Sequence, residues 1–363
     1  MNCFTKILDK DAEFIALSNA VNEASKCVGA TGLADINKLH IVHALCQKLN
    51  KKAIVLVPDE ATAIKACEDL NAFGSKALMY PRREFTFLDV EGISREFEHI
   101  RLGVLSKILK GDYDVIVAST AAACQMTMPP EKLTENSFTI HAGEEIDVKN
   151  ITDKLIRAGY TRFDQVDSTS QFSIRGGLID IFPPGADDPV RIELWGDTVD
   201  SIAKFDISTQ RRNDMVDSID IIPAGEVLFL SKEEQAKKID ALASSLKGKA
   251  IKAREKLYAD SDRLKQGLSL RCNDKYLPLA YESNGLFDYP SDLLFVLESG
   301  RCKERTENQN RLMLEDIKWL LEDGIICKGI DKFNLDFTEL CAQYEERKAV
   351  YLDSFPRGSF DTP

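Results

Sequence analysis

The chain of 363 residues lacks several features that would place it in a class at once. Its nine cysteines contain no CxxC pair, and an odd number with such spacing favours reduced thiols over a disulfide framework or a zinc site. No apolar run reaches the roughly 18 residues that a membrane-spanning helix needs. Low-complexity tracts and clear internal repeats are absent as well. These absences indicate a globular protein without a membrane partner.

The chain also contains few histidines and fewer basic than acidic residues. His40 and His43 form an HxxH pattern on a helical stretch, but no third ligand is near, so no metal site is predicted. The 47 Lys and Arg residues face 59 Asp and Glu, which makes the net charge −12. Nonspecific nucleic-acid binding would need a local basic stripe, and no run is longer than Arg211-Arg212 or Lys237-Lys238.

The length suits two or three domains, each able to bury its own core. The N-terminal segment MNCFTKILDKDAEF carries charges where a secretory leader needs apolar residues, so a cytoplasmic location is expected.

Uninterrupted apolar runs rich in Val and Ile predict an α/β fold. KKAIVLVP at 51–58, YDVIVAST at 113–120 and SDLLFVLES at 291–299 are typical of strands buried on both faces of a parallel sheet. Between the first two, Ser94 and Gly111 delimit a predicted amphipathic helix. Its apolar stripe consists of Phe97, Ile100, Val104, Ile108 and Leu109.

The middle of the chain predicts a small α+β domain inserted into this α/β domain. Its closely spaced strands are separated by the turn signals Gly176-Gly177, Pro183-Pro184-Gly185 and Gly196-Asp197. After Pro223 the pattern is helical at 231–268 and at 303–323, where the second stretch carries Leu312, Ile317, Leu320 and Leu321 on a helical period. The predicted segments are 1–146 (α/β domain, first part), 147–225 (small α+β domain), 226–290 (mostly helical subdomain), 291–345 (return to the α/β domain) and 346–363 (start of a linker to further domains).

GATGLADINK at 29–38 resembles a phosphate-binding loop but is degenerate. Gly29, Thr31 and Gly32 stand where such a loop needs them. Asp35, however, occupies the lysine position and Ile36 the magnesium-binding hydroxyl position. Because an acid at that point repels a triphosphate, the segment is interpreted as a strand-to-helix turn that kept its glycines for backbone shape.

Neither candidate for an Asp-Glu metal box is favoured. VPDEAT at 57–62 is better explained as a loop whose acids begin a helix. Leu297-Glu298 ends the later buried strand, with the Glu but without the Asp that would hold magnesium. The sequence therefore predicts no catalytic residue in the parallel-sheet domain.

One hairpin of the small domain carries a candidate binding face. In VRIELW, alternation places Val190, Ile192 and Leu194 on the core side and the intervening residues opposite them. Strand pairing across the turn PPGADDP would gather three side chains on one exposed face: Arg175, Arg191 and Trp195.

Two interpretations of these side chains stay open. In one, Arg191 pairs with Glu193 or Asp180, and Trp195 covers the core of a neighbouring domain. In the other, the face is a protein–protein hot spot, where Trp and Arg are over-represented. Residues 150–225 hold eight basic and thirteen acidic side chains, so the arginines suit a protein partner with carboxylates better than a nucleic-acid backbone.

The segment FSIRGGLIDIFPPGADDPVRIELWGDTVDSIAKFDISTQR at 172–211 resembles the one shared by the bacterial transcription-repair coupling factors and UvrB, a component of the nucleotide-excision repair excinuclease. Weaker similarity runs through MYPRREFTFLD, DVIVAST, GYTRFDQV and GLFDYPSDLLFVLES. The degenerate loop, the sequence Leu297-Glu298-Ser299-Gly300 in place of an Asp-Glu-Ser-His box, and the lack of a tyrosine-rich hairpin favour the coupling factors.

This resemblance implies a degenerate P-loop helicase-like domain whose inserted domain docks UvrA, another component of the excinuclease, through Arg175, Arg191 and Trp195. It implies a non-catalytic module, part of a longer chain, that recruits this repair enzyme in transcription-coupled DNA repair. ATP, magnesium, RNA polymerase and double-stranded DNA would belong to the translocase domains of that longer chain, and its C-terminal domain would cover the candidate binding face at rest.

Two alternatives accompany this expectation. One is an ATP-dependent damage-loading helicase module like UvrB, and the other is a module that only restrains the translocase.

Overall fold

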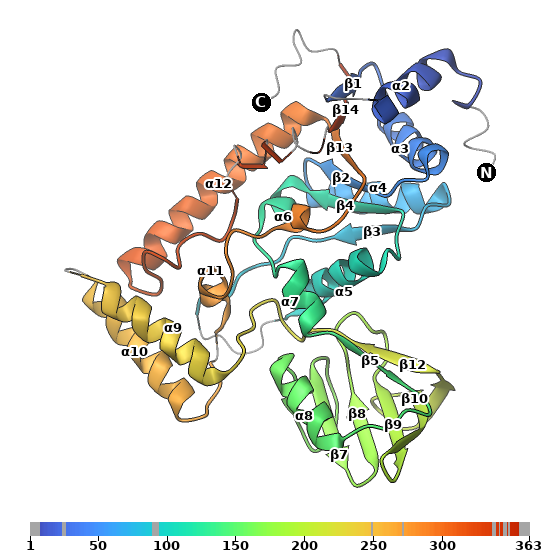
Figure 1. Ribbon diagram of the computed structural model, residues 1–363. Coiled ribbons are helices and arrows are strands. Elements are labelled where there is room, and N and C mark those ends of the chain that lie inside the picture. Colours follow the sequence, from blue (N-terminus) through green and yellow to red (C-terminus); the bar gives the residue numbers. More distant parts are fainter. Residues whose placement is uncertain are drawn as a thin grey trace.

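The computed structural model describes residues 8–23, 27–88, 94–247, 250–270, 272–335, 339–340, 342–343, 347 and 349–355 (Figure 1). None of the helices in this described part of the chain combines the length and the apolar character needed to cross a bilayer.

A six-stranded parallel sheet forms the centre of the α/β domain (Figure 1). All the residues of its central strands are buried, which explains why their sequences are apolar without alternation. The parallel sheet predicted from these runs is confirmed. In spatial order its strands are β1 (Val28–Ala30), β14 (Val350–Leu352), β13 (Leu293–Leu297), β2 (Ala53–Val57), β4 (Val115–Ser119) and β3 (Ala77–Tyr80).

Helices cover both faces of this sheet. On one face, α2 (Ala12–Glu23), α3 (Asp35–Leu49) and α4 (Glu60–Ala72) share a core with the sheet, in which Leu45 and Leu70 pack near Val55. The other face holds the larger core, to which α5 (Glu96–Lys110), α6 (Thr120–Cys124) and α7 (Pro130–Glu135) contribute. His40 and His43 lie on α3, as predicted, and His43 Nδ1 is 2.7 Å from Ser75 Oγ.

Helix α5 ends at Gly111, whose φ of 67° is the left-handed C-cap that the sequence predicts. The predicted stripe is partly wrong, however: Val104 and Ile108 are buried, but Phe97 and Ile100 are exposed. Glu98 and Arg101 occupy the buried side of the first turns instead. A search for apolar periodicity cannot detect buried charges, so it misplaced the inner face at the start of this helix.

The inserted domain contains a second six-stranded sheet, largely antiparallel as predicted (Figure 1). Helix α8 (Val148–Arg157) packs against its core face through Ile151 and Leu155. In spatial order the strands are β11 (Arg212–Met215), β10 (Thr198–Phe205), β9 (Val190–Trp195), β8 (Leu178–Ile181), β7 (Gln171–Arg175) and β6 (Thr161–Arg162).

A two-stranded antiparallel sheet joins the two ends of the inserted domain. Strand β5 (Phe138–His141) enters the domain and pairs with β12 (Ser218–Ile221), through which the chain leaves it. The predicted segmentation places β5 in the preceding segment, and the predicted boundaries stay predictions.

The helical part of the chain follows the inserted domain. Helices α9 (Lys232–Ser245) and α10 (Ile251–Lys265) lie side by side, and the short elements η1 (Asp274–Tyr276), α11 (Leu277–Ala280) and η2 (Leu286–Asp288) lead back to β13 (Figure 1). The long helix α12 (Ser299–Glu322) follows that strand. Its predicted stripe is half wrong, because Leu320 is buried and Ile317 partly buried, whereas Leu312 and Leu321 are exposed.

Candidate functional site

The hairpin face of the inserted domain has the alternation that the sequence predicts. Val190 and Ile192 of β9 are buried in the domain core, and the next strand adds Ile179 opposite Ile192. The intervening side chains of β9, namely Arg191, Glu193 and Trp195, point to the other face of the sheet. We call that opposite face the docking face; it comprises Arg175, Asp180, Arg191, Glu193, Trp195, Arg212 and Met215.

The structure brings the three predicted residues onto this one face. Strand register places Arg191 opposite Asp180, and Arg175 opposite Leu178, which in turn faces Glu193. Trp195 follows Glu193 by two residues on β9, so it projects the same way. Trp195 is 83% exposed and the Arg175 side chain 45%, whereas the Arg191 side chain is only 12% exposed.

Two glycines shape the turn beside Arg175. Gly176 has a φ of 60°, a backbone conformation that residues with a Cβ adopt at a cost. A Cβ on Gly177 would lie 3.1 Å from the Leu194 carbonyl oxygen, and the Leu194 N–H donates to the Gly177 carbonyl at 2.8 Å. The glycine pair therefore lets the start of β8 approach the end of β9, next to Trp195.

Asp180 connects the two arginines. Its carboxylate is 1% exposed and accepts hydrogen bonds from Arg191 Nε at 2.7 Å, Arg191 Nη2 at 2.8 Å and Arg175 Nη2 at 2.8 Å. The bond to Asp180 raises the pKa of Arg191. Of the pairings considered for Arg191 from the sequence, the structure therefore selects Asp180. Trp195 does not cover a neighbouring core, since most of its surface is exposed.

Several members of the docking face escape sequence reasoning. Met215 on β11 is 63% exposed and pairs with Ala203, which pairs in turn with Arg191. Arg212 Nη1 donates to Glu193 Oε2 at 2.6 Å. All four residues of β11 are exposed, so the strand lacks the apolar alternation that would have revealed it.

The segment predicted to be a degenerate phosphate-binding loop joins β1 to α3. Gly29 is on β1, Thr31 and Gly32 form the loop, Asp35 begins α3, and the Ile36 side chain is exposed. The buried Lys38 donates to Asp35 Oδ1 and to Ser354 Oγ, both at 2.8 Å, and forms an ion pair with Glu298.

The two segments predicted to be degenerate nucleotide motifs are thus linked to each other. Glu298, next to Leu297 at the end of β13, also accepts the Ser354 N–H at 2.8 Å. Burial works to lower the pKa of Lys38, but its bonds to Asp35 and Glu298 outweigh burial and raise it. One lysine thus faces two carboxylates, which leaves this group of three side chains with one net negative charge. Sequence reasoning missed Lys38, although its spacing of three residues from Asp35 on a helix was a signal.

The other candidate acid pair begins a helix, as predicted. Asp59 is the N-cap of α4 and accepts the Thr62 N–H at 2.9 Å. Bonds from Thr62 lower the pKa of Asp59. Within the part of the chain that the structure describes, no group of three or more His, Cys, Asp or Glu side chains is placed to hold a metal ion.

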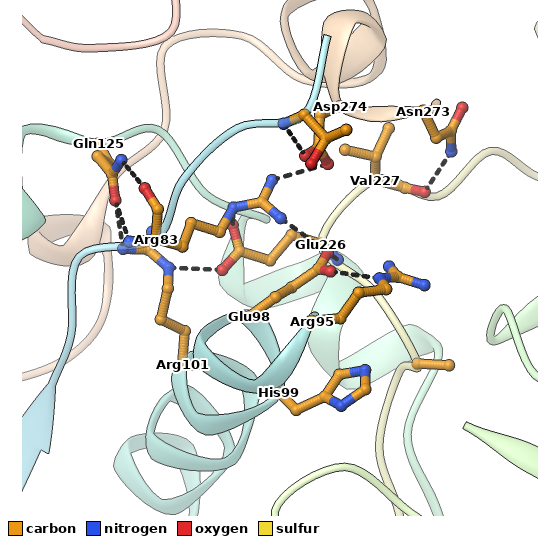
Figure 2. Close-up of polar contacts among 12 residues, drawn as sticks. Arg83, Arg95, Glu98, His99, Arg101, Gln125, Glu226, Val227, Asn273 and Asp274 are labelled. Atoms are coloured by element: carbon orange, nitrogen blue, oxygen red, sulfur yellow. Dashed lines mark hydrogen bonds and ion pairs between the residues drawn. The ribbon is translucent and has the colours of Figure 1, made fainter. Parts of the chain in front are cut away.

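A buried charge cluster lies where the inserted domain meets the rest of the chain (Figure 2). Arg101 Nε on α5 donates to Glu226 Oε1 at 2.6 Å, and both side chains are fully buried. Glu226 follows the last strand of the inserted domain by a few residues, and its N–H donates to Glu98 Oε1 at 2.8 Å. The chain that leaves the inserted domain is thereby fixed to α5.

Arg83 extends the cluster to the helical part of the chain. Its guanidinium contacts Glu98 at 3.0 Å, Glu226 at 3.4 Å and Asp274 at 3.1 Å (Figure 2). Gln125 accepts from Arg101 Nη1 at 3.1 Å and from the Arg83 N–H at 2.9 Å. The buried charge cluster, defined as Arg83, Glu98, Arg101, Glu226 and Asp274, therefore holds three parts of the molecule in one arrangement. At its edge the half-exposed Arg95 donates from Nε to Glu98 Oε2 at 2.7 Å.

Comparison with known proteins assigns the inserted domain to a class. Residues 138–226 match the family of UvrB interaction domains, a range that begins with β5 and ends at Glu226. The docking face therefore lies within a domain that matches the family of UvrB interaction domains.

Curated relatives extend the similarity to nearly the whole chain. It is 34% identical over 370 residues to the transcription-repair-coupling factor of Bacillus subtilis (strain 168), covering 98% of this chain and 31% of that protein. The corresponding factor of Myxococcus xanthus is 29% identical over 284 residues, covering 74% and 23%, and that of Staphylococcus aureus (strain USA300) is 28% identical over 231 residues, covering 63% and 20%. The predicted resemblance to transcription-repair coupling factors is confirmed, and the chain spans at most 31% of the length of these relatives.

We expect Glu226→Gln to lower the free energy of unfolding by about 3 kcal/mol or more, because it leaves Arg101 buried without its charged partner. Glu135→Gln is the matched control: it changes the same residue type in the exposed Lys132–Glu135 pair and should cost less than about 1 kcal/mol. Urea unfolding followed by circular dichroism measures both. Equal effects would show that the cluster contributes no more than a surface pair.

The lowered pKa of Glu98 leads to a prediction of how acid affects the stability that the same cluster provides. Burial would raise its pKa, but the guanidinium groups of Arg83 and Arg95 outweigh burial and lower it to about 2. Since the folded-state pKa lies below the usual value of 4.5, the stabilisation is present above pH 4.5 and is lost as the pH falls toward 2. Over that interval, the free energy of unfolding of the wild type should fall more steeply than that of Glu98→Gln. Parallel profiles would contradict the predicted shift.

Proposed function

We propose that the chain recruits UvrA, a component of the nucleotide-excision repair excinuclease, to sites where RNA polymerase has stalled at DNA damage, and that it docks this partner through Arg175, Arg191 and Trp195. The observation that carries the proposal is the exposure of Trp195 beside two arginines on one face of a domain that matches the UvrB interaction family. The relatives' names support a role in transcription-coupled repair.

The chemistry of the docking face suits a protein partner. Trp195 offers a large, mostly exposed apolar surface, and Trp and Arg are the residues that most often dominate binding energy at protein interfaces. Arg175 offers half-exposed guanidinium donors that match a carboxylate of the partner. The chain as a whole carries a charge of −12, which disfavours a phosphate backbone as its ligand.

In this proposal the chain itself is not an enzyme and holds no ATP. The position that would receive a triphosphate is lined by Asp35 and Glu298, and the nearby Lys38 is engaged by both. ATP, magnesium, RNA polymerase and double-stranded DNA would be bound by regions of the relatives that this chain does not span, and the relatives' C-terminal domain would contact the docking face at rest. The cytoplasmic location stays a prediction.

Substitution of the exposed docking residues tests recruitment directly. Arg175→Ala and Trp195→Ala should each weaken binding to purified UvrA by about 2 kcal/mol, roughly thirtyfold, because each removes a central hot-spot contact. Isothermal titration measures the affinity.

Ile156→Ala is the matched control for this titration. Ile156 is exposed on α8, which covers the opposite face of the same sheet, so its removal should leave the affinity unchanged. Wild-type affinity in both docking variants would refute the proposed function.

Titration with ATP and magnesium separates recruitment from an ATP-dependent damage-loading module. We expect no saturable heat, since the acids at the loop repel a triphosphate and Lys38 is already paired. Saturable binding that Lys38→Ala abolishes would favour the loading module instead.

A further inference from the structure

We propose that Asp180 is the positioning residue of the docking face: its buried carboxylate holds the Arg175 guanidinium in place for a carboxylate of the partner, and Arg191 acts largely through Asp180. This inference rests on the proposed function, and it differs from what the family resemblance implies, namely that Arg175 and Arg191 both contact the partner directly.

The two arginines differ in how many of their donors are already used. Arg191 donates from Nε and Nη2 to Asp180. Its Nη1 donates to the Gln210 carbonyl at 3.1 Å, and its Nη2 donates to Gln210 Oε1 at 3.2 Å. Its guanidinium lies 4.7 Å from the centroid of the Phe205 ring. Arg191 is therefore enclosed on several sides, which explains its low exposure.

Arg175 is held at one point and is otherwise accessible. Its Nη2 donates to Asp180 Oδ2 at 2.8 Å, and nearly half of its side chain is exposed. A guanidinium has five N–H donors in a fixed planar arrangement, so a single bond at Nη2 leaves a planar edge for a second carboxylate. Arg175 is thus the arginine that the partner can reach.

Asp180 gives this arrangement its rigidity. A free arginine side chain carries about 2 kcal/mol of rotamer entropy, part of which is lost when a partner immobilises it. A carboxylate that is already fixed by two bonds from Arg191 orders Arg175 before the partner arrives. Strands β7, β8 and β9 supply the three residues of this chain of contacts, so the sheet register itself sets their spacing.

The charges of the cluster also define the partner. Arg175, Arg191 and Asp180 together leave one net positive charge, and it lies at the accessible Arg175, on the same face as Trp195. The matching surface of UvrA should therefore present a carboxylate to Arg175 and an apolar area to Trp195.

The test is a double-mutant cycle on affinity for UvrA. Asp180→Asn keeps the side-chain size but removes the charge, and should weaken binding by about tenfold, as expected when a side chain must be ordered on binding. In the Arg175→Ala background the same substitution should have little further effect, because its target is gone. In the Trp195→Ala background its effect should be fully additive.

Arg175→Lys provides a second variant, at a side chain that is nearly half exposed. Lysine keeps the charge but loses the planar arrangement of donors, so it should bind almost as weakly as Arg175→Ala. Wild-type affinity in Arg175→Lys, or equal effects of Asp180→Asn in both backgrounds, would overturn the positioning role. If Arg175→Ala and Trp195→Ala themselves bind normally, the proposed function fails, so the two failures are distinguishable.

Discussion

Arg101 and Glu226 form a fully buried ion pair, and the placement of the inserted domain depends on it. Burying one of these charges alone would be strongly unfavourable, so α5 and the chain leaving the inserted domain must meet for either side chain to be stable. Arg83 adds Asp274 to the same arrangement, which ties in the helical part of the chain. We interpret this cluster as a set of contacts that favours one arrangement of the α/β domain, the inserted domain and the helical part of the chain, rather than as a large source of stability.

The parallel sheet could be predicted because its central strands are buried on both faces. Such strands appear in the sequence as apolar runs, and β2, β4 and β13 all pair within one sheet as expected. Helix α5 was predicted to exist, but not with the correct inner face. Arg101 and Glu98 are polar by type yet buried by position, since they have partners more than a hundred residues away. Their burial depends on tertiary contacts that a local pattern does not contain.

The docking face was predictable to a similar degree. Alternation in β9 placed Arg191 and Trp195 on one face, and the glycine pair placed Arg175 close to them. The role of Asp180 depends on register, because a shift of one residue would have turned its carboxylate into the core. The positions of Gln210 and Met215 depend on how the turn after β10 folds back and on the pairing of β11. The sequence contains no pattern that predicts either feature.

Basic side chains pair with carboxylates of the same chain in three places, and these places differ in how far the basic side chain is exposed. At the degenerate loop, Lys38 is buried and paired with two carboxylates of its own chain. In the buried charge cluster, Arg101 and Arg83 are likewise enclosed by carboxylates. On the docking face, the carboxylate of Asp180 is buried, but Arg175 stands at the surface, on the same face as an exposed tryptophan. A guanidinium that is ordered yet accessible can bind a second carboxylate without first losing its other contacts, so physical chemistry favours the docking face as the place where another protein attaches.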